Sequence, residues 1–188
     1  MKQTGPLFWQ PRKNYLKIIS RPCYGWILIL LNYAIWLFLF FISFLLIKND
    51  INAFWQLLIA TTIAELIERQ SKKRPFWQRP LYKKNKKVPK GLVRSWYNTG
   101  SFPSGHTTKA VYFFLFVLQY QVISPESYLL ISLPLIFFRV LVGFHYPIDI
   151  LGGLLIGPVI WFFSQNITPP VFLTNITKSI FDIIFFIK

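Results

Sequence analysis

The chain contains two histidines, and each lies in a short cluster of residues that suits phosphate chemistry. The first, His106, ends the run Pro-Ser-Gly-His at 103–106 and directly precedes an apolar segment. Ser104 is a favourable N-cap residue, so the run predicts a helix start, where free N–H groups and the helix dipole attract phosphate. Gly105 lets a ligand approach the backbone closely, which leaves His106 beside the bound anion in the first turn. The alternative is an ordinary capped helix with a histidine at a membrane interface.

The second histidine, His145, lies between Arg139 and Asp149. Pro147 suits the first turn of a helix, which places Asp149 in that turn and His145 just before it. This spacing can bring the carboxylate to one imidazole nitrogen and leave the other nitrogen free to attack phosphorus. Arg139 lies in an apolar run, where an arginine is costly unless it is paired, so it is a functional candidate. The alternative is a structural ion pair between Arg139 and Asp149, with His145 as a bystander.

A third, basic cluster precedes both histidines. Lys72 and Arg79 could clamp phosphate oxygens, and an arginine can do so bidentately. The alternative is positive charge that meets lipid headgroups, and for the run from Lys83 to Lys90 this second interpretation is preferred. Lys109, one helical turn after His106, either reaches the site or extends to the membrane surface.

The composition is that of an integral membrane protein. Hydrophobic residues make up 54% of the chain and charged residues 14%, against about 25% charged residues in a soluble domain. The apolar residues fall in long runs, so we expect an all-α, multi-span transmembrane bundle of five or six helices. The last segment, 171–187, is either a poor span or a helix in the membrane interface. The five clearer spans are 26–47, 51–67, 106–123, 127–144 and 147–164.

The order of these spans predicts where the clusters meet. Residues 1–25 are expected to form a basic interfacial arm, and residues 26–188 a single transmembrane domain with a basic active-site loop at 70–102. Because consecutive spans alternate in direction, the arm, the loop and the turn at 144–147 fall on one face of the membrane. The three clusters should therefore converge at that face, although they are far apart in sequence.

The net charge of +15 is concentrated, with 11 of the 21 lysines and arginines between Arg69 and Arg94. This run is tethered between spans and interleaved with aromatic residues, so anionic lipid headgroups are expected as partners and nucleic acid is not. The predicted site face carries 16 of the 21 basic residues, which slightly favours a cytoplasmic site by the positive-inside rule. Residues that bind phosphate inflate that count.

The order and spacing of the clusters resemble the type 2 phosphatidic acid phosphatase (PAP2) family over about residues 65–160. The family pattern is Lys-x6-Arg-Pro, then Pro-Ser-Gly-His, then Ser-Arg-x5-His-x3-Asp. Here Phe138 replaces the usual serine of the last motif, so one phosphate hydrogen bond is expected to be missing. The first motif has a second register that ends at Arg74 and puts Ile67 in the place of the lysine. Literal spacing favours the register of Lys72 and Arg79.

The resemblance implies an enzyme, a membrane lipid phosphatase with a PAP2/haloperoxidase-like helical core and neither metal nor other cofactor. It makes His145 the nucleophile that forms a phosphohistidine, Asp149 the group that orients it, and His106 the general acid. The remaining site residues would bind the phosphoryl oxygens: Lys72, Arg79, Ser104, the Gly105 amide, Arg139 and, in the other register, Arg74. The five expected spans argue against a soluble vanadium haloperoxidase, another kind of relative. Bacterial members of the family often have the site on the outer face of the membrane.

The substrate expected from the resemblance is a lipid phosphate whose tail stays in the bilayer. Polyprenyl phosphate or diphosphate, phosphatidate and phosphatidylglycerol phosphate are the candidates, and the basic loop favours the diphosphate or phosphatidylglycerol phosphate. Two alternatives are a lipid phosphotransferase that uses the same site and a non-catalytic membrane protein that binds anionic lipids.

Overall fold

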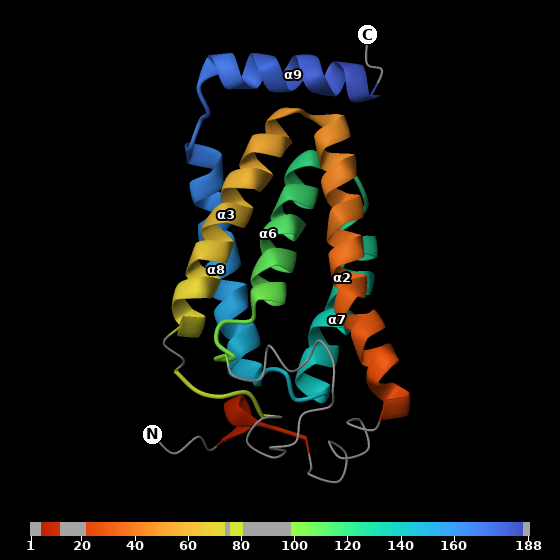
Figure 1. The fold of residues 1–188 in the computed structure, drawn as a ribbon, viewed down its shortest axis with the longest axis vertical. Helices are drawn as coiled ribbons and strands as arrows, with labels where there is room; N and C mark the ends of the chain where they lie inside the picture. The colour runs from red at the N-terminus through yellow and green to blue at the C-terminus, as the bar shows by residue number, and fades with distance from the viewer. Residues whose placement is uncertain (1–4, 12–21, 74–75, 81–98, 186–188) are drawn as a thin grey trace.

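The computed structural model describes residues 5–11, 22–73, 76–80 and 99–185 (Figure 1). Within these ranges the chain is helical, with one isolated β-bridge between Gln78 and Gly100, and the all-α prediction is confirmed. The elements are a 3-10 turn η1 (Pro6–Phe8) and the helices α2 (Pro22–Asn49), α3 (Asn52–Lys73), α6 (Gly105–Tyr120), α7 (Pro125–Leu141), α8 (Pro147–Asn166) and α9 (Val171–Phe185).

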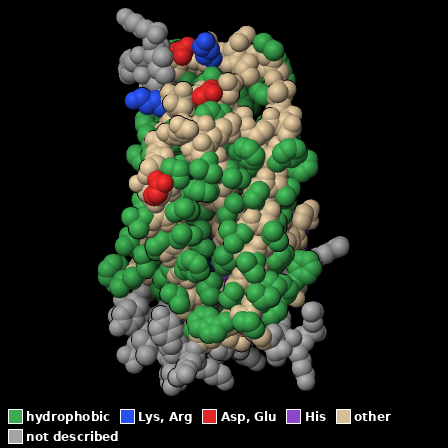
Figure 2. All heavy atoms as spheres, turned by 180° about the vertical axis from the view of Figure 1, so that it is seen from behind, with side chains coloured by type: hydrophobic (Ala, Val, Ile, Leu, Met, Phe, Trp, Pro, Cys, Tyr) green, Lys and Arg blue, Asp and Glu red, His purple; other side chains and the backbone are tan. Residues whose placement is uncertain are grey.

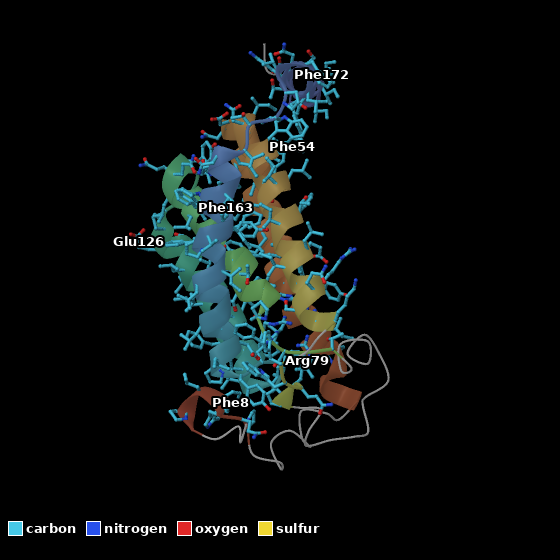
Figure 3. The ribbon with its side chains drawn as sticks, turned by 90° about the vertical axis from the view of Figure 1, so that its left-hand side faces the viewer. Phe8, Phe54, Arg79, Glu126, Phe163 and Phe172 are labelled. Atoms are coloured by element: carbon cyan, nitrogen blue, oxygen red, sulfur yellow. The ribbon has the colours of Figure 1, made fainter. Side chains whose placement is uncertain are left out.

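Five of these helices run along the long axis of the molecule and alternate in direction (Figure 1). The ends of α3 and α7 and the starts of α2, α6 and α8 consequently lie at one end of the bundle, which we call the site end. Phe8, in η1, and Arg79 also lie there, whereas Phe172 of α9 lies at the opposite end (Figure 3). Every described residue of the three clusters is thus carried by a segment at the site end.

Helix α6 packs against α2, α3, α7 and α8. Its approach to α8 is close because α8 presents glycines to it. A Cβ added at Gly153 would lie 2.7 Å from the Thr107 side chain, and one at Gly157 would lie 2.6 Å from Val111. Small residues that let helix backbones approach are typical of packing between membrane helices. The close contact fixes the start of α6 against the start of α8, where the two histidine clusters lie.

The last helix, α9, crosses the end of the bundle opposite the site end instead of running along it (Figure 1). The rings of Phe181 and Phe54 meet there with centroids 5.2 Å apart. The sequence left two alternatives for this segment, a poor span and a helix in the membrane interface, and an orientation across the bundle differs from that of the five long helices.

The surface of the bundle is apolar along much of its length. Among the described residues, two segments are long and apolar enough to cross a membrane, 26–49 within α2 and the whole of α8. Large hydrophobic side chains are exposed on α2, α7 and α8, including Leu37, Phe40, Leu130 and Leu155. One face is covered by such side chains, and its few visible charges lie in the upper half of the view (Figure 2). These features support membrane association.

Helix α3 extends further than the apolar run that predicts it. The run at 51–67 is free of charge until Glu65, but the helix continues to Lys73. Charged side chains are compatible with a helix end, so hydropathy underestimates the length of the helix. The extension places Glu68 and Lys72 on a helix, one turn apart, at the site end.

Candidate active site

The start of α6 brings His106 to the site end. Ser104 is the N-cap, and its Oγ accepts hydrogen bonds from the backbone N of Thr107, at 3.5 Å, and from Thr107 Oγ1, at 2.9 Å. The backbone N–H of Ser104 donates to the carbonyl oxygen of Asp149 at 3.0 Å, which ties this turn to α8. The helix therefore begins where the sequence predicts. Ser104 is fully buried and its oxygen is used in capping, whereas Gly105 and His106 line the pocket described below.

A tight turn between α7 and α8 positions His145. Gly143 adopts φ 77°, a left-handed conformation that favours glycine. The turn lets the backbone N–H groups of Phe144 and His145 both donate to the carbonyl oxygen of Arg139, at 2.9 and 3.2 Å. The spacing between Arg139 and His145 is thus the span of one helix-terminating turn, and it places both side chains at the same pocket.

The imidazole of His145 lies between a carboxylate and a guanidinium. Its Nδ1 is 3.4 Å from Oδ2 of Asp149, and its Nε2 is 3.4 Å from Nη1 of Arg79. The side chain is 2% exposed. Burial lowers the pKa of His145 from 6.5 to about 4, the Asp149 carboxylate opposes this shift, and the charge of Arg79 adds to it. The ring is therefore neutral at pH 7, with a lone pair on one nitrogen, as a nucleophile requires.

The Asp149 carboxylate is fully buried and held on both oxygens. Oδ2 accepts a hydrogen bond of 2.8 Å from the backbone N–H of Tyr146, and Oδ1 accepts one of 2.9 Å from Trp77 Nε1. The sequence interpretation assigned Trp77 only to the aromatic residues at the membrane interface. The sequence could have marked Trp77 as a site residue, because it lies between Lys72 and Arg79, inside the first basic motif.

Arg79 is buried at the site end. Nη1 donates to the Phe144 carbonyl oxygen at 3.1 Å, and Nη2 approaches Thr99 Oγ1 at 3.5 Å. Burial lowers the pKa of Arg79 to about 10, opposed by Asp149 and Glu68, so the guanidinium stays charged at neutral pH. Arg79 and Lys72 both line the pocket. Arg74, the alternative register, and the run Lys83–Lys90 lie outside the described residues.

Arg139 reaches the pocket from the end of α7. Its Nη1 donates a hydrogen bond of 2.6 Å to Oδ1 of Asn32, and its guanidinium lies 5.6 Å from the centroid of the Phe144 ring. Asn32 belongs to α2 and is 3% exposed. The sequence interpretation missed Asn32, although a buried amide within a long apolar run is itself a signal, because a polar group in such a run needs a partner.

These residues surround a pocket of about 340 Å³. Its charged lining residues are Glu65, Glu68, Lys72, Arg79, Lys109 and Arg139. Its other lining residues are Trp36, Gly105, His106 and His145. The chemistry-bearing histidines and four cations therefore face one cavity, which suits an anionic substrate.

The side of the pocket nearest α3 carries a cluster of alternating charges. Lys109 Nζ lies 3.2 Å from Glu65 Oε2 and 3.1 Å from Glu68 Oε2, and Lys72 is paired with Glu68. Lys109 also lies over the ring of Trp36, 4.9 Å from its centroid. Of the two alternatives for Lys109, reaching the site and extending to the surface, the structure has the first. The acidic members were not among the predicted site residues.

A mainly apolar groove of about 540 Å³ adjoins the pocket. It lies between α2, α3 and α6 and shares Trp36 and Lys109 with the pocket. Its apolar lining includes Leu37, Leu39, Phe40 and Phe113. A ligand could thus place a charged group in the pocket and an apolar group in the groove.

The fold and the pocket together define a helical protein built around a buried histidine–aspartate pair and a cavity lined by four cations. The family model of the PAP2 superfamily matches residues 53–172, and the chain belongs to this superfamily. Proteins of the superfamily are generally phosphatases, so the family supports phosphatase-type activity on a phosphate substrate. No curated protein and no solved structure matches the chain significantly. Within the described ranges, no group of three or more His, Cys, Asp or Glu side chains could hold a metal ion.

Proposed function

We propose that the chain is an integral membrane phosphatase that hydrolyses a lipid phosphate or diphosphate through a phosphohistidine intermediate. The observation that carries this proposal is the setting of His145. One ring nitrogen lies 3.4 Å from the Asp149 carboxylate, and the other lies 3.4 Å from Arg79 in a pocket lined by four cations. Such a ring is oriented for attack, neutral at physiological pH and adjacent to the charges that would hold a phosphoryl group.

In the first step, the lone pair on Nε2 of His145 forms a bond to phosphorus while the bond from phosphorus to the leaving oxygen breaks. His106, as the imidazolium that the negative charge of the bound phosphate favours, gives its proton to that oxygen and becomes neutral. Nε2 of His106 is buried, and no hydrogen-bond partner for it lies among the described residues, so it is available to a ligand. Asp149 stabilises the positive charge that develops on the His145 ring.

The phosphoryl oxygens are held by fixed positive charge throughout this step. Arg79, Arg139 and Lys72 supply cations, and the start of α6 at Gly105 supplies backbone N–H groups and the positive end of its dipole. Ser104 contributes by capping that helix. In the second step, water attacks phosphorus and gives a proton to His106, the N–P bond breaks, and inorganic phosphate leaves with His145 neutral again.

Support for a lipid substrate comes from the surroundings of the pocket. The apolar groove continues from the pocket at Trp36 and Lys109, and apolar side chains are exposed along α2, α7 and α8. We propose that the five long helices span the bilayer, α9 lies in the opposite interface, and the tail of the substrate enters the groove from the lipid. Anionic headgroups are the proposed partners of the basic loop.

We propose that the site end faces the cytoplasm. The arm at 1–25 and the stretch from Arg69 to Arg94 hold 16 of the 21 basic residues, and both are assigned to that side. The topology can be tested with a cysteine placed between residues 83 and 90 in a chain whose native Cys23 is replaced by serine. An impermeant thiol reagent should leave that cysteine unlabelled in intact cells and label it after lysis. Labelling in intact cells would reverse the orientation without affecting the chemistry.

The activity itself is tested by phosphate release in detergent with EDTA present. The substrates are polyprenyl phosphate and diphosphate, phosphatidate and phosphatidylglycerol phosphate, and the variant is His145→Ala. We expect release from at least one of these lipids by the wild type and none by the variant. Turnover that requires an added alcohol or lipid acceptor would indicate phosphotransfer. Absence of release would contradict the proposal, and loss of release in EDTA would contradict the mechanism.

A further inference from the structure

A carboxylate lies within the pocket that binds the phosphate. Glu68, in the last turns of α3, lines the pocket, and a Cβ added at Gly105 would overlap its carboxylate. Glu68 therefore lies directly against the start of α6, where the positive end of the helix dipole attracts anions. It is paired with both Lys72 and Lys109. One acidic side chain thus already interacts with two of the four cations and with the helix N-terminus.

The net positive charge of the pocket lining is therefore small. Its lining contains four cations, Lys72, Arg79, Lys109 and Arg139, and two carboxylates, Glu65 and Glu68, for a difference of two positive charges. A phosphate monoester carries about −1.5 to −2 charges at pH 7, so one such group balances the lining. A diphosphate brings further negative charge, which this lining does not balance.

The position of the apolar groove also disfavours a second phosphate. On the side of the pocket towards the groove, the cation near a second phosphate is Lys109, and two carboxylates within 3.2 Å already compensate its charge. Lys109 and Trp36 form the boundary between the pocket and the apolar groove. The lining thus changes from charged to apolar at Lys109 and Trp36.

We infer that Glu68 makes the pocket selective for a single phosphate group attached directly to an apolar chain, and that it disfavours a diphosphate. The inference rests on the proposed phosphatase function and narrows it. It opposes the preference for a diphosphate that the basic loop at 70–102 indicates from the sequence. Glu68 acts by repelling the second phosphate and by holding Lys72 and Lys109, so it determines specificity and is not a catalytic residue.

The test compares two substrates with the same chain, farnesyl phosphate and farnesyl diphosphate, by the initial loss of each substrate. The wild type should have the higher kcat/KM for the monophosphate. Glu68→Gln should raise the ratio of diphosphate to monophosphate kcat/KM by about tenfold or more, because a unit charge a few ångströms away acts strongly in a partly buried site. Glu126→Gln is the matched control at the exposed start of α7, and it should leave the ratio unchanged.

A second measurement needs no variant and decides the question if Glu68→Gln does not fold. Inorganic phosphate should inhibit the wild type at lower concentration than pyrophosphate. A wild type that prefers farnesyl diphosphate, a ratio unchanged in folded Glu68→Gln, or stronger inhibition by pyrophosphate would overturn the inference while leaving the phosphatase function intact. Failure of the wild type to hydrolyse either compound or any lipid of the panel would contradict the function itself, and the inference with it.

Discussion

Trp77 and Asp149 are 72 residues apart in sequence, yet a hydrogen bond of 2.9 Å joins the indole Nε1 to the carboxylate Oδ1. The other carboxylate oxygen accepts from the backbone of Tyr146 and lies 3.4 Å from His145. A side chain of the first basic motif thus orients the carboxylate that orients the proposed nucleophile. The coupling links the segment that carries Arg79 to the turn that carries His145.

Replacement of Trp77 by phenylalanine removes this hydrogen bond and keeps most of the ring. Because the buried carboxylate loses one of its partners and can rotate, kcat should fall by about tenfold, and the Tm should also fall. Trp55→Phe is the matched control at the opposite end of α3, and it should retain wild-type kcat. Equal activity of Trp77→Phe and the wild type would show that Trp77 has no positioning role.

Asp149→Asn should have a larger effect than the loss of Trp77. The amide retains the shape of the side chain but removes the charge that stabilises the ring of His145 and selects its tautomer. We expect kcat to fall by about two orders of magnitude or more, as for other carboxylates that orient a reactive histidine. A variant with kcat within threefold of the wild type would show that Asp149 serves only to cap α8.

Asn32 should control how Arg139 is presented to the phosphate. Asn32→Leu removes the acceptor of the 2.6 Å hydrogen bond, whereas Asn32→Asp keeps an oxygen in the same place. Since a hydrogen bond to a charged group contributes about 1.5–3 kcal/mol, we expect kcat/KM to fall by about tenfold or more in Asn32→Leu. Asn32→Asp should retain most of the activity. The same loss in both variants would mean that α2 packing, and not Arg139, is responsible.

The buried His145 should make stability depend on pH. Its pKa falls from 6.5 in the unfolded chain to about 4 in the folded one, so the unfolded chain binds more protons between these values. Well above pH 6.5 the ring is neutral in both the folded and the unfolded chain. The free energy of unfolding therefore decreases as the pH falls from 6.5 towards 4. The shift corresponds to about 3 kcal/mol at most.

Thermal unfolding in detergent measures this dependence. The Tm of the wild type should fall more steeply between pH 6.5 and 4 than the Tm of His145→Gln, which lacks the titrating ring. The difference between the two proteins isolates His145 from the carboxylates and His106, which both proteins share. Parallel curves would show that His145 does not titrate with a lowered pKa.

The residues that the sequence predicted correctly as neighbours lie close together in sequence or in one turn. His145, Asp149 and Arg139 are linked by a helix end, a glycine turn and a helix start, and local stereochemistry alone brings them together. The start of α6 at Gly105 could be predicted for the same reason, since Ser104 carries its own capping signal.

The residues that were missed contact the site from distant elements. Asn32 and Trp77 meet Arg139 and Asp149 only because α2 and the segment after α3 pack at the site end. Glu68 was missed because hydropathy ends the second span near the first charge, whereas the helix continues to Lys73 and turns that side chain towards α6. A local pattern can mark such residues as unusual, but their partners depend on how whole helices pack.

The proposed mechanism requires that His145 carry the phosphoryl group during turnover. It is tested most directly by mixing the protein with a lipid substrate radiolabelled in its phosphate, stopping the reaction within milliseconds in alkali, and mapping the label. We expect an alkali-stable, acid-labile phosphoryl group on the peptide that contains His145, and no label in His145→Ala. A wild type that releases phosphate without ever carrying label, or label on any other residue, would contradict it.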